Sequence, residues 1–123
     1  MPLDRPDAVK PALVACLCAE WCGVCRDYAQ TFRDMEARFP QARFLWIDVE
    51  DEADLLHPLE VENFPTLLIV VDGQPRFLGP LRPQAETLER LIRAHLDDGN
   101  GSALSHPDVV SLAARLNGPQ ARV

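Results

Sequence analysis

Apolar residues follow two different patterns along the first half of this chain, an uninterrupted run and a repeat of three to four residues. The segment from Leu13 to Ala19 is apolar at every position, which is typical of a strand covered on both faces. Arg43 to Val49 is predicted to form a second strand. Between them, apolar residues at steps of three and four predict a helix that ends at Pro40. This helical stripe consists of Cys25, Tyr28, Ala29, Phe32, Met35 and Phe39. The order strand, helix, strand predicts a right-handed crossover between parallel strands.

The second half of the chain continues this alternation of helices and strands. A short helix is predicted within residues 51–59, where Pro58 interrupts it. Thr66–Val71 and Pro75–Leu78 are predicted to pair as a hairpin across Asp72-Gly73, a dipeptide typical of tight two-residue turns. The next helix has a buried face and is followed by Gly99. That face consists of Leu88, Leu91, Ile92 and Leu96. The whole pattern predicts an α/β fold with a mixed sheet flanked by helices.

The last part of the chain predicts a separate helix behind a flexible linker. Residues 97–102 are polar and rich in glycine, as linkers are. Ser105 to Asp108 then resembles a helix start with a capping box, in which Ser105 is the cap. An apolar face follows, and we expect it to cover open surface of the sheet or to dock on a second copy; the alternative is a disordered tail. We therefore divide the chain into a domain of residues 1–98 and a linker with a C-terminal helix in 99–123.

Composition limits the class of protein more than it specifies a function. The chain has 123 residues, a hydrophobic fraction of 47% and a formal net charge of −7, which fits one packed domain and argues against nucleic acid or an anionic membrane as a partner. No segment approaches the length of a membrane span, and the N-terminus lacks the apolar region of a signal peptide. We expect a cytoplasmic protein, in which a cysteine pair is more often catalytic or metal-binding than structural.

The segment Trp21-Cys22-Gly23-Val24-Cys25 is the strongest candidate for chemistry. It lies where the first strand gives way to the first helix. At a helix N-terminus, unpaired N–H groups and the helix dipole favour negative charge, so Cys22 is expected to form the thiolate that attacks disulfides. Cys25 lies one turn further on and can resolve a mixed disulfide.

With its surroundings, this segment resembles the active site of the thioredoxin family. The resemblance covers roughly residues 11–96 and continues through Pro65, which precedes a strand, and Gly79, which follows the last strand. It implies a thioredoxin-like fold with a central mixed sheet flanked by helices. Only 21 residues precede Cys22, so we expect the family's first strand to be shortened or absent, with at most a short helix near Asp7 to Lys10, and the C-terminal helix to be an addition.

The resemblance also implies a function and a set of site residues. It implies a thiol–disulfide oxidoreductase in which Cys22 is the nucleophile, Cys25 the resolving cysteine, and Pro65 a cis proline beside them. Substrate peptides would bind at Trp21, Gly23, Val24, Phe64, Pro65 and Thr66. The partners implied are protein disulfides and an external electron donor such as a thioredoxin reductase, with no cofactor, no metal, and a monomer or weak dimer.

Two departures from the family concern proton transfer and redox potential. The family's buried aspartate beneath the resolving cysteine corresponds to Cys16 here, and its partner lysine corresponds to Phe44. We expect slower resolution of mixed disulfides unless Glu20, Asp48 or water accepts the proton. Val24 replaces the proline common inside the motif, and we expect a weaker reductant as a result.

The remaining cysteines, Cys16 and Cys18, leave several alternatives open. They share one face of their strand because side chains alternate. They are expected to be small core residues, or Cys16 lies under Cys25 and traps it or relays oxidation inward. A zinc site would use Cys16, Cys18, Cys22 and Cys25 together. A binding or chaperone-like module with idle cysteines is the main alternative to an enzyme.

Overall fold

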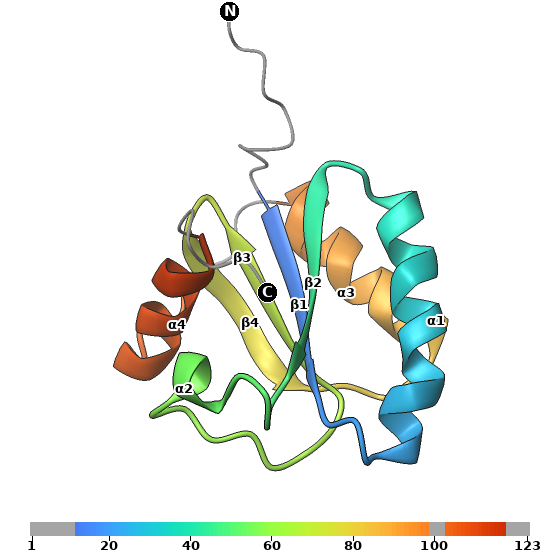
Figure 1. The fold of residues 1–123 in the computed structure, drawn as a ribbon. Helices are drawn as coiled ribbons and strands as arrows, with labels where there is room; N and C mark the ends of the chain where they lie inside the picture. Colours follow the sequence, from blue (N-terminus) through green and yellow to red (C-terminus); the bar gives the residue numbers. More distant parts are fainter. Residues whose placement is uncertain (1–11, 99–102, 118–123) are drawn as a thin grey trace, which may run out of the picture.

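The computed structural model describes residues 12–98 and 103–117, which form four strands and four helices (Figure 1). The elements are β1 (Ala12–Cys18), α1 (Gly23–Arg38), β2 (Ala42–Asp48), α2 (Ala53–Leu56), β3 (Thr66–Val71), β4 (Gln74–Pro80), α3 (Ala85–Asp98) and α4 (Pro107–Asn117). The strands and long helices predicted from the two periodicities are therefore all present, with small shifts at their ends.

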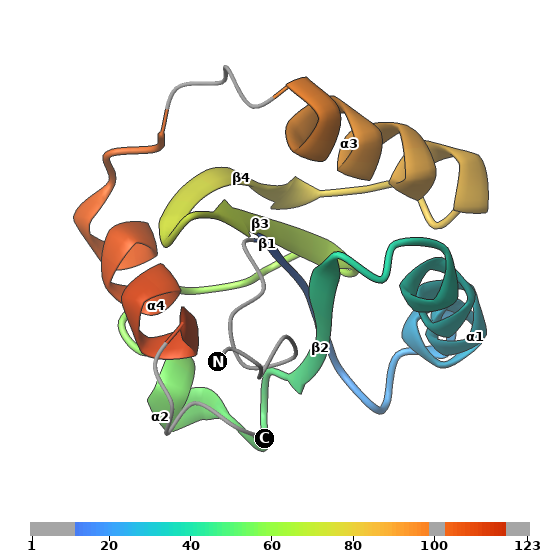
Figure 2. The ribbon, with the colours of Figure 1, turned by 90° about the horizontal axis from the view of Figure 1, so that it is seen from above.

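The sheet has the strand order β2-β1-β3-β4. β1 pairs in parallel with β2 and antiparallel with β3, and β3 pairs antiparallel with β4. Helices α1 and α3 cover one face, and α2 and α4 lie on the other (Figures 1 and 2). This is the expected mixed sheet flanked by helices, and β1 is one of its two central strands.

Alternation along β1 builds two cores, one on each face of the sheet. The side chains at even positions, from Ala12 to Cys18, pack with α1 and α3. Those at odd positions, from Leu13 to Leu17, pack with residues of α2 and α4. Every residue of β1 is buried, because a central strand covered on both faces has no side that water reaches. Cys16 and Cys18 consequently lie on the same face as α1.

The hairpin between β3 and β4 turns at Asp72-Gly73, as predicted. Asp72 has φ 54° and Gly73 has φ 80°, the left-handed pair that a two-residue hairpin turn requires. Glycine adopts this conformation without steric cost, and aspartate tolerates it better than most residues. The turn brings β4 beside β3 and places Gly79 opposite Leu67.

Helix α4 covers the sheet face opposite α1, as the first of the three possibilities for this segment predicted. Leu112, Ala113 and Leu116 are fully buried and belong to the same core as the odd residues of β1. The prediction that Ser105 caps this helix is wrong. The helix begins at Pro107, so the residue before it, His106, accepts the Asp108 N–H through Nδ1 at 3.2 Å. Proline at the first helical position sets this boundary because its ring favours the start of a helix.

Within the described residues β1 is the first strand, and β2 is an edge of the sheet. The predicted helix near Asp7 to Lys10 lies outside the described residues. No helix in the described part of the chain is both long and apolar enough to cross a bilayer.

Candidate active site

Cys22 lies at the N-terminal end of α1. It is the N-cap residue, with extended backbone, and its carbonyl accepts the Arg26 N–H at 3.1 Å. Its own N–H donates to the Ala19 carbonyl at 3.0 Å. The thiol is free and half-buried, whereas the other three cysteines of the chain are buried. Cys22 is therefore the cysteine that a substrate can reach, at the helix end where backbone N–H groups favour an anion.

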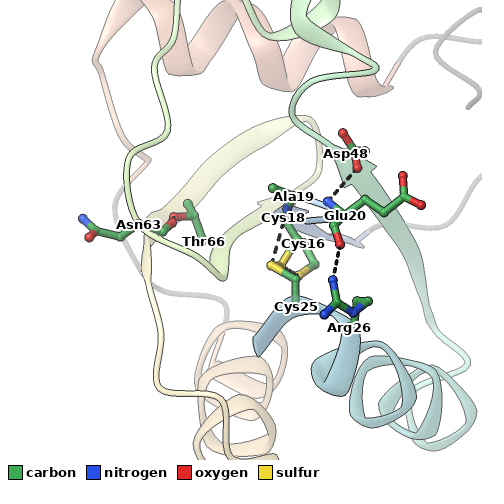
Figure 3. Close-up of a disulfide and its surroundings, with 9 residues drawn as sticks. All are labelled: Cys16, Cys18, Ala19, Glu20, Cys25, Arg26, Asp48, Asn63 and Thr66. Atoms are coloured by element: carbon green, nitrogen blue, oxygen red, sulfur yellow. Dashed lines mark hydrogen bonds between the residues drawn. A yellow bond between two sulfur atoms is a disulfide. The ribbon is translucent and has the colours of Figure 1, made fainter. Parts of the chain in front are cut away.

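Cys25, in the first turn of α1, forms a disulfide with Cys18 at the end of β1 (Figure 3). Their Cα atoms are 5.8 Å apart, an ordinary spacing for a disulfide. Both residues are buried, with 1% of Cys25 and 0% of Cys18 exposed. The Ala19 N–H donates to Cys25 Sγ at 3.4 Å. The oxidised pair thus joins the end of the central strand to the start of the helix.

This disulfide differs from the expected pairing of Cys25 with Cys22, and it changes the interpretation of the strand cysteines. The interpretation of Cys18 as a simple core residue is wrong, because its sulfur is bonded to Cys25. The alternative in which Cys16 traps Cys25 is wrong as well, because the strand residue bonded to Cys25 is Cys18 and Cys16 is free. Cys18 lies at the end of β1, directly beside the start of α1, whereas Cys16 lies two residues further back at about 3.3 Å per residue.

Cys16 remains a free thiol beside the disulfide. Its Sγ donates to Cys18 Sγ at 3.9 Å, and burial raises the pKa of Cys16 to about 12. The hydroxyl of Tyr28 is buried and has no hydrogen-bond partner among the residues that the structure describes. Burial, followed by the nearby Cys16, raises the pKa of Tyr28 as well. Both groups hold their protons at neutral pH, so this side of the site carries no charge.

Asp48 connects the two loops that surround the cysteines. Its Oδ2 accepts the Glu20 N–H at 3.0 Å, and its Oδ1 accepts the N–H groups of Glu50 and Asp51 at 2.9 and 3.1 Å. These bonds, led by the one from Asp51, hold the pKa of Asp48 below its usual value. Arg26 connects the first of these loops to α1 by donating to the Glu20 carbonyl at 2.9 Å (Figure 3).

The same contacts make Asp48 a poor candidate for the missing proton acceptor. A carboxylate that already accepts three N–H groups and has a lowered pKa binds a further proton weakly. The sequence pointed to Asp48 as a possible base but not to this structural role. An aspartate at the end of a strand, followed by a turn, is the signal for it, because such side chains often accept backbone N–H groups one to three residues ahead.

Trp21, Gly23 and Val24, which are expected to contact substrate, flank Cys22 in the chain, and Phe64 contacts Trp21. Trp21 is 61% exposed, donates from Nε1 to Glu50 Oε2 at 2.8 Å, and meets the ring of Phe64 edge-on at 5.7 Å. Val24 is 43% exposed. The Phe64-Pro65 bond is cis, as the resemblance implied. Trp21, Val24 and Phe64 therefore present an apolar rim next to the free thiol.

Pro65, Thr66 and Gly23 are the other residues expected to contact substrate. Pro65 is buried, and its carbonyl accepts the Leu81 N–H at 3.0 Å. Thr66 is buried and donates its hydroxyl to the Asn63 carbonyl. Gly23 has open space around it, since an added Cβ would meet only the Arg26 side chain at 3.8 Å. The side chains of Pro65 and Thr66 are therefore not exposed to a substrate, and steric crowding does not explain the glycine.

The structure does not present the four thiolates that a zinc site would need. Two of the four sulfurs are bonded to each other, and a bonded sulfur is not a thiolate ligand. In the described ranges 12–98 and 103–117, no group of three or more His, Cys, Asp or Glu side chains is arranged to hold a metal ion. The site as it stands fits thiol–disulfide exchange better than metal binding.

Comparison with known proteins gives consistent matches. The family model named Thioredoxin matches residues 7–94. An H-type thioredoxin of Oryza sativa subsp. indica is 30% identical over 96 residues, which is 78% of this chain and 69% of that protein. The structure of Fasciola hepatica thioredoxin is similar with a TM-score of 0.65 at 22% identity, covering 72% of this chain and 85% of that one. Oxidised mitochondrial thioredoxin 3 of Saccharomyces cerevisiae is similar with a TM-score of 0.61 at 27% identity and the same coverage.

Proposed function

Because the chain belongs to the thioredoxin family of thiol–disulfide oxidoreductases, we propose that Cys22 is the thiol with which it attacks protein disulfides. The observation that carries this assignment is the position of Cys22. It is the free, half-buried cysteine at the N-terminal end of α1, and an attacking thiol must be both accessible and able to form a thiolate.

The reaction proceeds in two exchange steps. Cys22 Sγ attacks one sulfur of the substrate disulfide, which forms a mixed disulfide and releases the other substrate sulfur as a thiolate. Cys25 then attacks Cys22 Sγ, which forms the Cys22–Cys25 disulfide and releases the second substrate thiol. Cys25 is three residues ahead on the same helix turn, so its sulfur lies within reach of Cys22.

The exposed rim around Cys22 supports binding of an extended, partly apolar peptide. Trp21 and Val24 are exposed on either side of Cys22 in the chain, Phe64 contacts Trp21, and the bond from Phe64 to Pro65 is cis. We propose that the peptide's backbone lies against the chain at Phe64-Pro65 while its side chains contact this rim.

Reduction of insulin disulfides with dithiothreitol as electron source tests the assignment. Cys22→Ala should lower the rate by at least about a hundredfold, as removal of a nucleophile does. Cys25→Ala should keep the attack and accumulate a mixed disulfide that mass spectrometry detects on Cys22. If Cys22→Ala keeps its activity while folded, Cys22 is not the nucleophile, and a binding module with idle cysteines becomes the better account.

Three further properties belong to the same proposal. We expect the oxidised protein to be reduced by an external donor such as a thioredoxin reductase, to act in the cytoplasm and to be a monomer or weak dimer. The acidic surface implied by a net charge of −7 is consistent with self-repulsion between copies. Sedimentation at several protein concentrations tests the oligomeric state, and turnover with a purified reductase tests the donor.

A further inference from the structure

The sulfurs of Cys22, Cys25 and Cys18 define a path from the surface into the core. Cys22 is half-buried, Cys25 is 1% exposed, and Cys18 is 0% exposed. Cys25 follows Cys22 on one helix turn and is bonded to Cys18. Cys25 is therefore the one residue positioned to exchange partners between a surface thiol and a core thiol.

We propose that Cys18 is a third redox-active cysteine. After each oxidation it displaces Cys22 from the Cys22–Cys25 disulfide, so that Cys18 is bonded to Cys25 and Cys22 is again a free thiol. The proposal rests on the function proposed above, because it begins where the Cys22–Cys25 disulfide has formed. It assigns to the oxidised protein the state that the structure contains, with Cys18 and Cys25 bonded and Cys22 free.

The step is an internal exchange that needs no further oxidant. Cys18 Sγ, as the thiolate, attacks Cys25 Sγ. The Cys18–Cys25 bond forms, the Cys22–Cys25 bond breaks, and its electron pair remains on Cys22 Sγ. The proton lost by Cys18 is balanced by one taken up at Cys22, directly or through solvent. One disulfide is present before and after, so the substrate disulfide remains the only oxidant in the cycle.

Oxidation should stop at Cys18 and not pass to Cys16. Cys16 Sγ is close, at 3.9 Å from Cys18 Sγ, but a Cys16–Cys18 bond would join two residues that are two positions apart on one strand. At about 3.3 Å per residue, their Cα atoms lie near the upper limit for a disulfide.

The rearrangement would change what the oxidised protein can do. With Cys25 bonded to Cys18, a new mixed disulfide on Cys22 has no resolving thiol beside it and persists. The Cys18–Cys25 disulfide is buried, so an external reductant reaches it through the reverse exchange, in which Cys22 attacks Cys25. Cys22 thus takes part in both the formation and the reduction of the buried Cys18–Cys25 disulfide.

Peptide mapping of the full-length wild-type protein tests the pairing without a variant. The protein is oxidised with oxidised glutathione, blocked with an alkylating reagent at low pH, and cut with a protease specific for glutamate. Cleavage after Glu20 separates Cys16 and Cys18 from Cys22 and Cys25. We expect the two peptides to be joined by Cys18–Cys25, with Cys22 alkylated or carrying glutathione. Separate peptides with an internal Cys22–Cys25 disulfide would overturn the proposal.

The redox midpoint in graded glutathione buffers gives a second test. If the buried disulfide is favoured over Cys22–Cys25 by about tenfold, Cys18→Ala should raise the midpoint by about 30 mV, since tenfold corresponds to that change for two electrons. Cys16→Ala is the matched control and should leave it unchanged, because that residue takes no part in the exchange. An equal midpoint for wild type and Cys18→Ala would contradict the proposal.

The Cys22→Ala variant tests the route by which the buried disulfide is reduced. After oxidation to Cys18–Cys25, it should be reduced by dithiothreitol at least about tenfold more slowly than wild type, because the internal attacking thiol is missing. Reduction at the wild-type rate would show that the Cys18–Cys25 disulfide is reduced without attack by Cys22. Failure of these tests leaves the insulin assay intact, whereas an active Cys22→Ala variant in that assay would remove the proposed function itself.

Discussion

Asp48 shows how one side chain holds the loops of the active site in place. Its carboxylate accepts backbone N–H groups from the loop before Cys22 and from the turn after β2. Hydrogen bonds to a charged acceptor are stronger than those between neutral groups. Glu20 is thereby held at both its N–H, by Asp48, and its carbonyl, by Arg26. These bonds help to hold the loop before Cys22 in place.

Replacing Asp48 with alanine should lower the free energy of unfolding by about 1 kcal/mol, a modest cost because the site is largely solvated. Urea titration measures the change, and the matched control is Asp51→Ala, which keeps the backbone N–H that Asp48 accepts. The Asp48 contribution should also fade in acid. Its pKa is lowered in the folded state, so its stabilisation is present above the ordinary carboxyl pKa and is lost as the pH falls through the folded value. An equal loss in both variants would contradict this role.

The two free cysteines of the oxidised protein should differ sharply in reactivity. Cys22 is half-buried at the surface, whereas Cys16 is 0% exposed with a raised pKa of about 12. Iodoacetamide should therefore label Cys22 in the native protein and Cys16 only after unfolding, because the thiolate is the reactive form. Mass spectrometry of the labelled protein reads this directly. Labelling of both thiols at similar rates would show that the core around Cys16 opens readily.

At the scale of elements, α4 forms part of the core that the sheet needs. The odd side chains of β1 point toward α2 and α4, and Leu112 and Leu116 cover them with no exposed surface of their own. Arg115 adds polar contacts from α4, since it donates to the Leu55 carbonyl at 3.0 Å and to the His57 carbonyl at 3.3 Å. A helix at the end of the chain thus shields a sheet face near the α2 segment.

The buried face of α4 gives a direct prediction for stability. Leu112→Ala should lower the free energy of unfolding by about 3 kcal/mol, through lost apolar burial and a cavity. Val110 lies on the same helix but is 42% exposed, so Val110→Ala should change the stability by less than about 0.5 kcal/mol. Urea unfolding of both variants measures the difference. A similar small effect in both would mean that α4 is loosely attached in solution, as would weak hydrogen-exchange protection across residues 108–116.

At the scale of the whole molecule, two buried groups that lose a proton at high pH limit the stability of the folded protein in alkaline solution. Cys16 and Tyr28 lie in the core between the sheet and α1, and burial raises the pKa of both. The folded protein keeps these protons at a pH where the unfolded chain has released them. Folded stability is therefore tied to the uncharged state of this core.

The oxidised protein should lose stability as the pH rises from about 9 to about 12. Cys16 has an ordinary pKa of 9.0 and a folded pKa of about 12. Its contribution is thus fully present below the first value and declines toward the second, with Tyr28 adding to the loss. Cys16→Ala should reduce the decline, whereas at neutral pH it should cost about 1 kcal/mol or less, as small core changes do. The measurement is the urea midpoint at increasing pH. A decline of equal steepness in the variant would place its cause elsewhere.

The sequence by itself determined most of the secondary structure and identified the reactive segment. The apolar periods of β1 and α1, the Asp72-Gly73 turn and the spacing of Cys22 and Cys25 are local properties, which depend on residues near one another in the chain. Alternation along β1 also placed Cys16 and Cys18 correctly on one face. The helix cap was misassigned because Ser105 has a side chain typical of that position, whereas the helix begins at Pro107 and the carbonyl of His106 accepts its first N–H groups.

Only the tertiary structure decided which cysteine Cys25 meets. The choice depends on where the start of α1 lies above β1, and this position follows from the packing of α1 against the sheet and from the loop that Asp48 and Arg26 hold. A shift of two residues along the strand would have brought Cys16 to the same place, since both thiols point to one side. Sequence spacing specifies the face of a strand, but the distance along it is set by contacts between segments that are far apart in the chain.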